Sequence, residues 1–215
     1  MGSLQSLIYI YKSIRKDMGK EKKILAFDLY GTILDLSAIS QEMRRKQLEY
    51  TWLLTIMGRY VDFDEITKIA ISYTLGEDKI EEELNKWRSL RTHQDAIYLK
   101  DISTIADIYI LSNGTTKTIE ELLKLNGLSS YFKGIFSAER VKEYKPSPKV
   151  YRYFLEAVKG EAYLVSSNPF DVIGAKNSGM KGIYVNRRNM PVDPLGYEPD
   201  VVVRDFKELY EWLQK

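Results

Sequence analysis

With 215 residues, 44% of them hydrophobic, the chain can bury a substantial core and suits one domain with an elaboration or two modest domains. Its 32 basic and 30 acidic residues nearly cancel to a net charge of +2, which gives no indication of a nucleic-acid partner. The absence of cysteine excludes disulfides, cysteine nucleophiles and thiolate metal sites, and the single His93 argues against a histidine-based catalytic cycle.

The N-terminal segment, residues 1–23, precedes the first strong pattern and ends in a charged run. We expect it to be a dispensable helical extension, or the result of an upstream start with Met18 as the alternative first residue. No stretch of the sequence has the apolar length that a membrane span needs, and residues 3–11 lack the basic leader of a signal peptide. We therefore expect a cytoplasmic protein without a membrane partner.

Five short apolar runs predict β-strands, with helical patterns or loops between them. Such alternation is typical of a mostly parallel sheet in an α/β protein, here with a Rossmann-like catalytic core at residues 24–34 and 98–215. The predicted strands are residues 24–27, 108–111, 162–165, 182–185 and 201–203.

The interval 35–97 contains no convincing strand but carries two long amphipathic stretches, at residues 39–57 and 63–75. We interpret it as an inserted helical subdomain. Ligands of open parallel sheets bind outside the carboxyl ends of the strands, where Asp28 and the other strand-end residues emerge. The insertion is therefore expected to cover that opening as a cap.

Polar residues follow the predicted strands in four separated segments, 28–32, 111–114, 145–146 and 166–171. An aspartate after a strand is by itself most often a turn or helix-cap residue. The ordered set, however, resembles the four motifs of the haloacid dehalogenase superfamily, and the resemblance runs from about Ile24 to the C-terminus. It implies that Asp28 is a nucleophile.

Two positions differ from the phosphatases of that superfamily, which carry an aspartate where this chain has Tyr30 and usually another at the position of Ser167. A phenol, with an ordinary pKa near ~10, is a poor proton donor for a leaving alkoxide, whereas a halide needs no proton. Magnesium prefers carboxylate oxygens, which both positions lack. The pattern therefore favours carbon–halogen cleavage without a metal or another cofactor.

The segment 44–53 closely resembles the first cap helix of the L-2-haloacid dehalogenases. On a helix, the four-residue spacing of Arg44, Leu48 and Trp52 places a guanidinium and apolar side chains on one stripe, which suits a halogenated chain with an ionised end. The resemblance implies hydrolysis of short (S)-2-haloalkanoic acids by a homodimer joined partly through its caps.

If the resemblance holds, Asp28 displaces the halide to form an ester, and water then attacks the ester carbonyl, with Asp171 as base or water-positioning group. Thr32 would orient Asp28, and Arg44, Asn113 and Phe170 would receive the halide. The implied catalytic residues are Asp28, Thr32, Arg44, Ser112, Lys145, Tyr151, Ser166, Asn168 and Asp171. The implied substrate and halide contacts are Leu29, Tyr30, Arg44, Leu48, Phe63, Ser112, Asn113 and Phe170.

Several of these residues also have simpler interpretations. Asp171 is placed to cap the helix that follows it, and Lys145 to be a solvated loop residue. Arg45 is the alternative candidate for the role given to Arg44 if the match to the cap helix is shifted by one residue. Trp52 and Tyr50 suit packing or subunit contact better than substrate contact, because large aromatic side chains favour cores and interfaces.

Two other functions compete with dehalogenation. A phosphatase for a small phosphorylated metabolite shares the fold and nucleophile but needs magnesium, and Tyr30 and Ser167 argue against it. A catalytically silent binding protein of the same fold is the second rival, and the presence of Asp28, Lys145 and Asp171 argues against that one.

Overall fold

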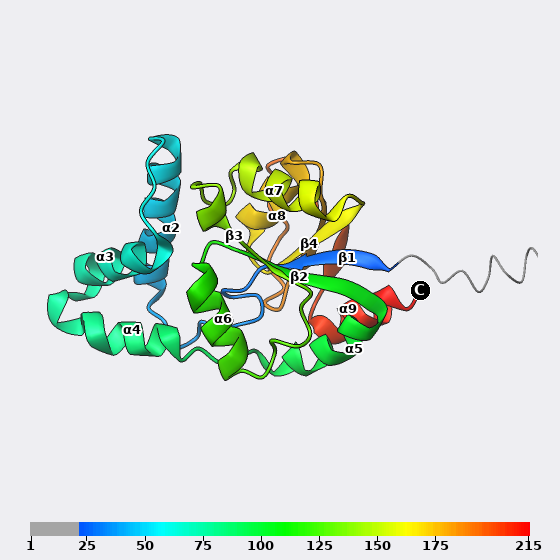
Figure 1. The fold of residues 1–215 in the computed structure, drawn as a ribbon, viewed down its shortest axis with the longest axis horizontal. Helices are drawn as coiled ribbons and strands as arrows, with labels where there is room; N and C mark the ends of the chain where they lie inside the picture. The colour runs from blue at the N-terminus through cyan, green and yellow to red at the C-terminus, as the bar shows by residue number, and fades with distance from the viewer. Residues whose placement is uncertain (1–21) are drawn as a thin grey trace, which may run out of the picture.

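A computed structural model describes residues 22–215 of the chain (Figure 1). Nearly all of the N-terminal extension predicted at residues 1–23 lies outside the described part. Six parallel strands form one sheet in the order β3-β2-β1-β4-β5-β6. The strands are β1 (Lys23–Phe27), β2 (Ala106–Ser112), β3 (Ile135–Ser137), β4 (Ala162–Ser166), β5 (Lys181–Val185) and β6 (Val201–Val203). The predicted α/β class with a mostly parallel sheet is confirmed.

Strand β1 lies in the middle of the sheet between β2 and β4. Its residues Leu25, Ala26 and Phe27 are fully buried, as a parallel strand covered on both faces requires. Strand β3 was not predicted, because it has only three residues, two of them half-buried, and gives too short an apolar run.

Helices cover both faces of this sheet (Figure 1). No helix among residues 22–215 is both long and apolar enough to cross a membrane. The helices of the core are α5 (Leu99–Ile105), α6 (Thr116–Leu125), α7 (Pro148–Val158), α8 (Pro169–Asn177) and α9 (Phe206–Leu213), with the 3-10 turns η2 (Gln94–Tyr98) and η3 (Ala138–Arg140).

Three helices inserted between β1 and β2 stand apart from the sheet, at the end toward which its strands point (Figure 1). They are α2 (Gln41–Ile56), α3 (Phe63–Leu75) and α4 (Ile80–Arg88), with the turn η1 (Glu77–Lys79). Ser40 and Asp62 cap α2 and α3 by accepting hydrogen bonds from backbone N–H groups of the first turn. The two predicted helices and the inserted helical cap are thus confirmed, although the buried residues of α2 are Met43, Gln47 and Thr51, two of which are polar.

The chain enters and leaves this insertion at adjacent points. Leu34 pairs with Thr92 in an antiparallel bridge, and the Asp35 N–H donates to the Arg91 carbonyl at 2.8 Å. The N–H of His93 donates to the Ile33 carbonyl at 2.9 Å, so the histidine lies at the return to the core. The division of the chain at residues 35 and 97 stays a prediction.

The carboxyl ends of three neighbouring strands carry the polar residues that the sequence singled out. Ser112 and Ser166 are the last residues of β2 and β4, and Asp28 directly follows β1, between them. All three side chains are buried. The sheet order therefore gathers three of the four motifs under the inserted helices.

We expect Gly174→Ala to destabilise the fold by about 1–3 kcal/mol, because the added Cβ overpacks a filled interface. It would lie 2.6 Å from Pro146 Cβ and 2.6 Å from the hydroxyl of Tyr151. Gly160→Ala is the matched control, since its Cβ would meet Ile24 Cδ1 at 3.3 Å, the far end of a side chain. Urea unfolding of both variants checks this, and a Gly174→Ala protein as stable as the parent contradicts the close packing.

Candidate active site

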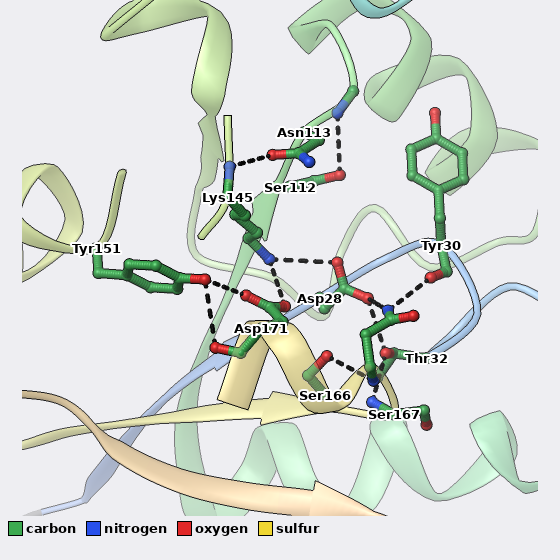
Figure 2. Close-up of polar contacts among 12 residues, drawn as sticks. Asp28, Tyr30, Thr32, Ser112, Asn113, Lys145, Tyr151, Ser166, Ser167 and Asp171 are labelled. Atoms are coloured by element: carbon green, nitrogen blue, oxygen red, sulfur yellow. Dashed lines mark hydrogen bonds and ion pairs between the residues drawn. The ribbon is translucent and has the colours of Figure 1, made fainter. Parts of the chain in front are cut away.

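The carboxylate of Asp28 is held by three side chains, one from its own loop and two from distant parts of the sequence (Figure 2). Its Oδ2 accepts hydrogen bonds from the Thr32 hydroxyl at 2.8 Å and from Asn168 Nδ2 at 2.8 Å. Its Oδ1 lies 3.2 Å from the Lys145 ammonium. The side chain of Asp28 is therefore fixed in orientation and balanced in charge at the end of β1.

Lys145 also contacts a second buried carboxylate. Its ammonium donates to Asp171 Oδ2 at 2.8 Å, and the other oxygen of Asp171 accepts from the Tyr151 hydroxyl at 2.7 Å. Lys145 is 1% exposed and Asp171 is fully buried. One ammonium thus joins the two carboxylates, and Tyr151 on α7 fixes the second one (Figure 2).

Burial and charge act in opposite directions on this cluster. Burial by itself would lower the pKa of Lys145, but the carboxylates of Asp171 and Asp28 outweigh it, so its pKa is raised and the ammonium stays charged. Burial raises the pKa of the Asp171 carboxyl, while the neighbouring Lys145 opposes that rise. Burial also raises the pKa of Tyr151 far above its ordinary value, so this phenol remains a hydrogen-bond donor.

The loops after β2 and β4 each contain a hydrogen bond between residues two apart in the sequence. Ser112 Oγ accepts from the N–H of Gly114 at 3.2 Å, and Ser166 Oγ accepts from the N–H of Asn168 at 3.1 Å. The amide oxygen of Asn113 accepts from the Lys145 N–H at 2.9 Å, which turns its NH2 group to the opposite side. Both loops are therefore rigidly placed beside Asp28.

A cleft of about 550 Å³ opens where the inserted helices meet the core. Arg44 and Leu48 of α2 line it together with Asn168, so these two residues of the predicted stripe face the core loops. Trp52 and Asp28 are not among the residues that line the cleft. Arg44 donates to Gln47 Oε1 at 2.5 Å, and Gln47 Nε2 donates in turn to Thr67 Oγ1 at 2.5 Å. This chain of buried contacts orients the guanidinium.

The predicted apolar contacts separate into two groups. Phe170, half-buried, packs edge-on against Trp52 with ring centroids 5.5 Å apart, which joins α8 to α2. Phe63 and Leu29 are fully buried, and Phe63 packs against the ring of Tyr30 at 5.6 Å. Phe63 therefore packs against Tyr30 and does not line the cleft, whereas Leu48 does.

Arg187 was not assigned a role from the sequence, yet it joins three parts of the site. Its guanidinium donates to Ser167 Oγ at 2.9 Å and to the Thr32 carbonyl at 2.9 Å, and it forms an ion pair with Asp95 at 2.8 Å. The Ser167 N–H also donates to the Thr32 hydroxyl at 2.8 Å. At the position where a phosphatase usually carries a metal-binding carboxylate, this chain thus has a hydroxyl bonded to a cation, a donor set that does not fit magnesium.

The contacts decide between the alternative interpretations of several residues. Asp171 lies in the first turn of α8, but its carboxylate binds Lys145 and Tyr151 instead of capping backbone N–H groups. Lys145 is buried, so it is not a solvated loop residue. Arg45 also borders the cleft, but its side chain is 69% exposed and pairs with Glu49, whereas Arg44 donates to the buried side chain of Gln47.

We expect Lys145→Met to destabilise the protein by about 3–5 kcal/mol at neutral pH, because it leaves two buried carboxylates uncompensated. Losing the ammonium raises the folded-state pKa of Asp171 further, so the folded protein takes up a proton before the unfolded chain does. The deficit therefore shrinks as the pH falls toward about 5.

Urea unfolding at both pH values measures this effect. Lys176→Met is the matched control, because its partner Asp200 is partly exposed and the pair contributes at most about 1 kcal/mol. Equal deficits for the two variants, or a deficit that grows on acidification, would contradict the proposed charge balance.

Comparison with known proteins places this geometry in a family. The haloacid dehalogenase-like hydrolase family matches residues 25–185. The haloacetate dehalogenase H-2 of Moraxella sp. (strain B) is 33% identical, over 86% of this chain and 94% of that protein. The (S)-2-haloacid dehalogenase H-109 of Pseudomonas putida is also 33% identical, over 88% of this chain and 96% of that protein.

Solved structures that are similar to this chain include dehalogenases as well. The L-2-haloacid dehalogenase from Xanthobacter autotrophicus superimposes with a TM-score of 0.82 at 29% identity, over 90% of this chain and 98% of that one. The same enzyme with chloropropionic acid covalently bound gives a TM-score of 0.79 over the same shares. The chain therefore belongs to the haloacid dehalogenase-like hydrolase family, as the order of its four motifs predicted.

Proposed function

We propose that the protein is a metal-independent (S)-2-haloacid dehalogenase, which hydrolyses short 2-haloalkanoic acids to (R)-2-hydroxy acids through an ester on Asp28. The observation that carries the proposal is the fixed, lysine-paired Asp28 carboxylate under a cap that presents Arg44. A relative whose structure contains covalently bound chloropropionic acid supports the same chemistry.

In the first step a carboxylate oxygen of Asp28 attacks the carbon that carries the halogen, and the halide departs on the opposite side, which inverts that carbon. Thr32 and Asn168 hold the carboxylate in orientation. Arg44 and Asn113 supply the N–H groups that stabilise the developing negative charge, with the Phe170 ring beside them.

The substrate carboxylate is bound by neutral donors of the strand ends. Ser112 has its oxygen committed to the N–H of Gly114, so its hydroxyl proton is free to point at the ligand. The backbone N–H groups of Leu29 and Tyr30 complete this site in the proposal. Leu48 forms the apolar wall along the rest of the chain.

In the second step water attacks the carbonyl carbon of the Asp28 ester, and the bond between that carbon and the ester oxygen breaks. The departing alkoxide takes up the proton that the water has lost and leaves as the 2-hydroxy acid, while release of the water's second proton restores the Asp28 carboxylate. Asp171 accepts the water proton, because it is a fully buried carboxylate held by Lys145 and Tyr151. Ser166 supports this centre by fixing the Asn168 backbone. Since water attacks the enzyme's own carbonyl, the inverted carbon is not touched again.

The cap also supports the proposal that two copies of the chain associate. Large apolar side chains of α2, α3 and the turn after α2 are exposed, and exposed apolar side chains gathered on neighbouring elements are typical of an interface. The most exposed are Ile56 at 83%, Tyr73 at 68%, Met57 at 58%, Leu53 at 45% and Ile69 at 43%. We propose a homodimer joined through this face; the cytoplasmic location stays a prediction.

The protein is expected to release chloride from (S)-2-chloropropionate with a chelator present, and much less from the (R) enantiomer. Asp28→Asn should abolish release, because the amide is no nucleophile. Chloride assay of both enantiomers checks this. A phosphatase would instead hydrolyse p-nitrophenyl phosphate only with added magnesium, and that result would overturn the proposal.

Asp171→Asn is expected to form the ester but to hydrolyse it slowly, because displacement of halide needs no base while attack by water does. Intact-protein mass spectrometry after substrate addition should then show a persistent adduct on the Asp28 peptide. Asp200→Asn, which changes a distant and partly exposed aspartate, is the control and should show no lasting adduct. Normal turnover in the Asp171→Asn protein would remove Asp171 from the mechanism.

Ile56→Asp is expected to weaken dimerisation by placing a charge in the proposed interface. Sedimentation at micromolar concentration measures it against Ile97→Asp, which alters a residue of η2 that is 73% exposed but lies outside the cap face. The proposal requires a dimer for the parent and for Ile97→Asp, and a shift to monomer for Ile56→Asp. A monomeric parent protein would contradict it.

A further inference from the structure

Two adjacent buried groups under the cap lack a hydrogen-bond partner. Among the described residues, Tyr30 Oη and Trp87 Nε1 are both unpaired, although their side chains are only 2% and 1% exposed. Leaving a buried donor unpaired is unfavourable, because its hydrogen bond to water is lost and not replaced. A native protein that keeps two such groups side by side calls for something that pairs with them.

The two groups belong to one aromatic cluster. The rings of Tyr30 and Trp87 stack with centroids 4.7 Å apart, and Phe63 packs against both. The indole N–H is near enough to the Tyr30 oxygen to lower its pKa in part, without the geometry of a hydrogen bond. The Arg44 guanidinium also lies beside this cluster, 5.9 Å from the Trp87 ring centroid.

The charges around this cluster keep both groups as donors. Burial, followed by the nearby carboxylate of Asp64, raises the pKa of Tyr30 far above its ordinary value, and Arg44 only partly opposes this. Asp64 itself accepts hydrogen bonds from the hydroxyls of Thr115 and Thr118. A neutral phenol, an indole N–H and a guanidinium in apolar surroundings suit a small, weakly hydrated anion.

The direction of the Tyr30 side chain suits the anion that the proposed reaction releases, which is the halide. Its hydroxyl points away from Asp28 and from the Lys145 ammonium (Figure 2). In a back-side displacement the halide departs on the side opposite the nucleophile. We propose that the indole N–H of Trp87, together with the Tyr30 hydroxyl and Arg44, receives the departing halide and thereby sets the preference for the leaving group; this rests on the proposed function.

The first test does not depend on turnover. The chain has three tryptophans, so protein labelled with ¹⁵N at the indole gives three N–H signals, and Trp87→Phe identifies one of them. Sodium bromide is expected to shift the Trp87 signal to saturation and to leave Trp212 unchanged, whereas sodium sulfate at equal ionic strength shifts neither. A Trp87 signal that does not respond to bromide overturns the proposal, even if the enzyme is active.

The second test measures the leaving group in turnover. Trp87→Phe keeps a ring but removes the donor, and kcat for (S)-2-chloropropionate is expected to fall by roughly 10- to 100-fold. The fall in kcat should be smaller for (S)-2-bromopropionate, because bromide is the better leaving group. The inhibition constant for bromide should rise. Trp212→Phe is the control with unchanged values.

Equal losses for both substrates with unchanged bromide inhibition would mean that Trp87 only supports the packing, which refutes the proposal. A protein that releases no halide from either substrate but shows the bromide shift would refute the proposed function while retaining the anion site. The two inferences therefore fail in different ways.

Discussion

A single buried ammonium, that of Lys145, makes this site possible. Two buried carboxylates close to one another repel each other and resist desolvation, and one of them would be protonated without a cation between them. Lys145 contacts Asp28 at 3.2 Å and Asp171 at 2.8 Å, so one ammonium offsets the negative charge of both buried side chains. One aspartate is then available as nucleophile and the other as base, and the orientation of each is fixed by further donors.

The same principle extends to the loops around the nucleophile. The guanidinium of Arg187 joins the first and fourth motif loops by donating to the Thr32 carbonyl and to Ser167 Oγ. Asp95, at the return from the cap, holds Arg187 in place. Lys145 and Arg187 thus supply the positive charge of the site. Arg187 also links Asp95, where the chain returns from the cap, to the loop that carries Asp28.

Features with a local signal could be predicted from the sequence. The apolar runs before Asp28, Ser112 and Ser166 defined three adjacent strands, and helical periodicity defined α2 and α3. The short strand β3 and the hydrogen-bonded chain from Arg44 through Gln47 to α3 depend on tertiary packing, for which the local sequence has no distinct pattern.

The sequence alone also could not indicate a role for Trp87. As an aromatic residue near the end of a charged helix it reads as a packing residue, and only its contact with Tyr30 reveals that its N–H is unpaired. Asp171 illustrates the reverse case, because its place in the first turn of α8 suggests a cap until Lys145 and Tyr151 are seen to hold it.

The central claim is that an oxygen of Asp28, and not of water, attacks carbon. A single turnover in ¹⁸O-labelled water, with enzyme in excess over (S)-2-chloropropionate, tests it most directly. The account predicts that the heavy oxygen enters the Asp28 carboxylate, detected by peptide mass spectrometry, while the hydroxy acid remains unlabelled. Heavy oxygen in the hydroxy acid and none in Asp28 would contradict the account, because water would then have displaced the halide itself.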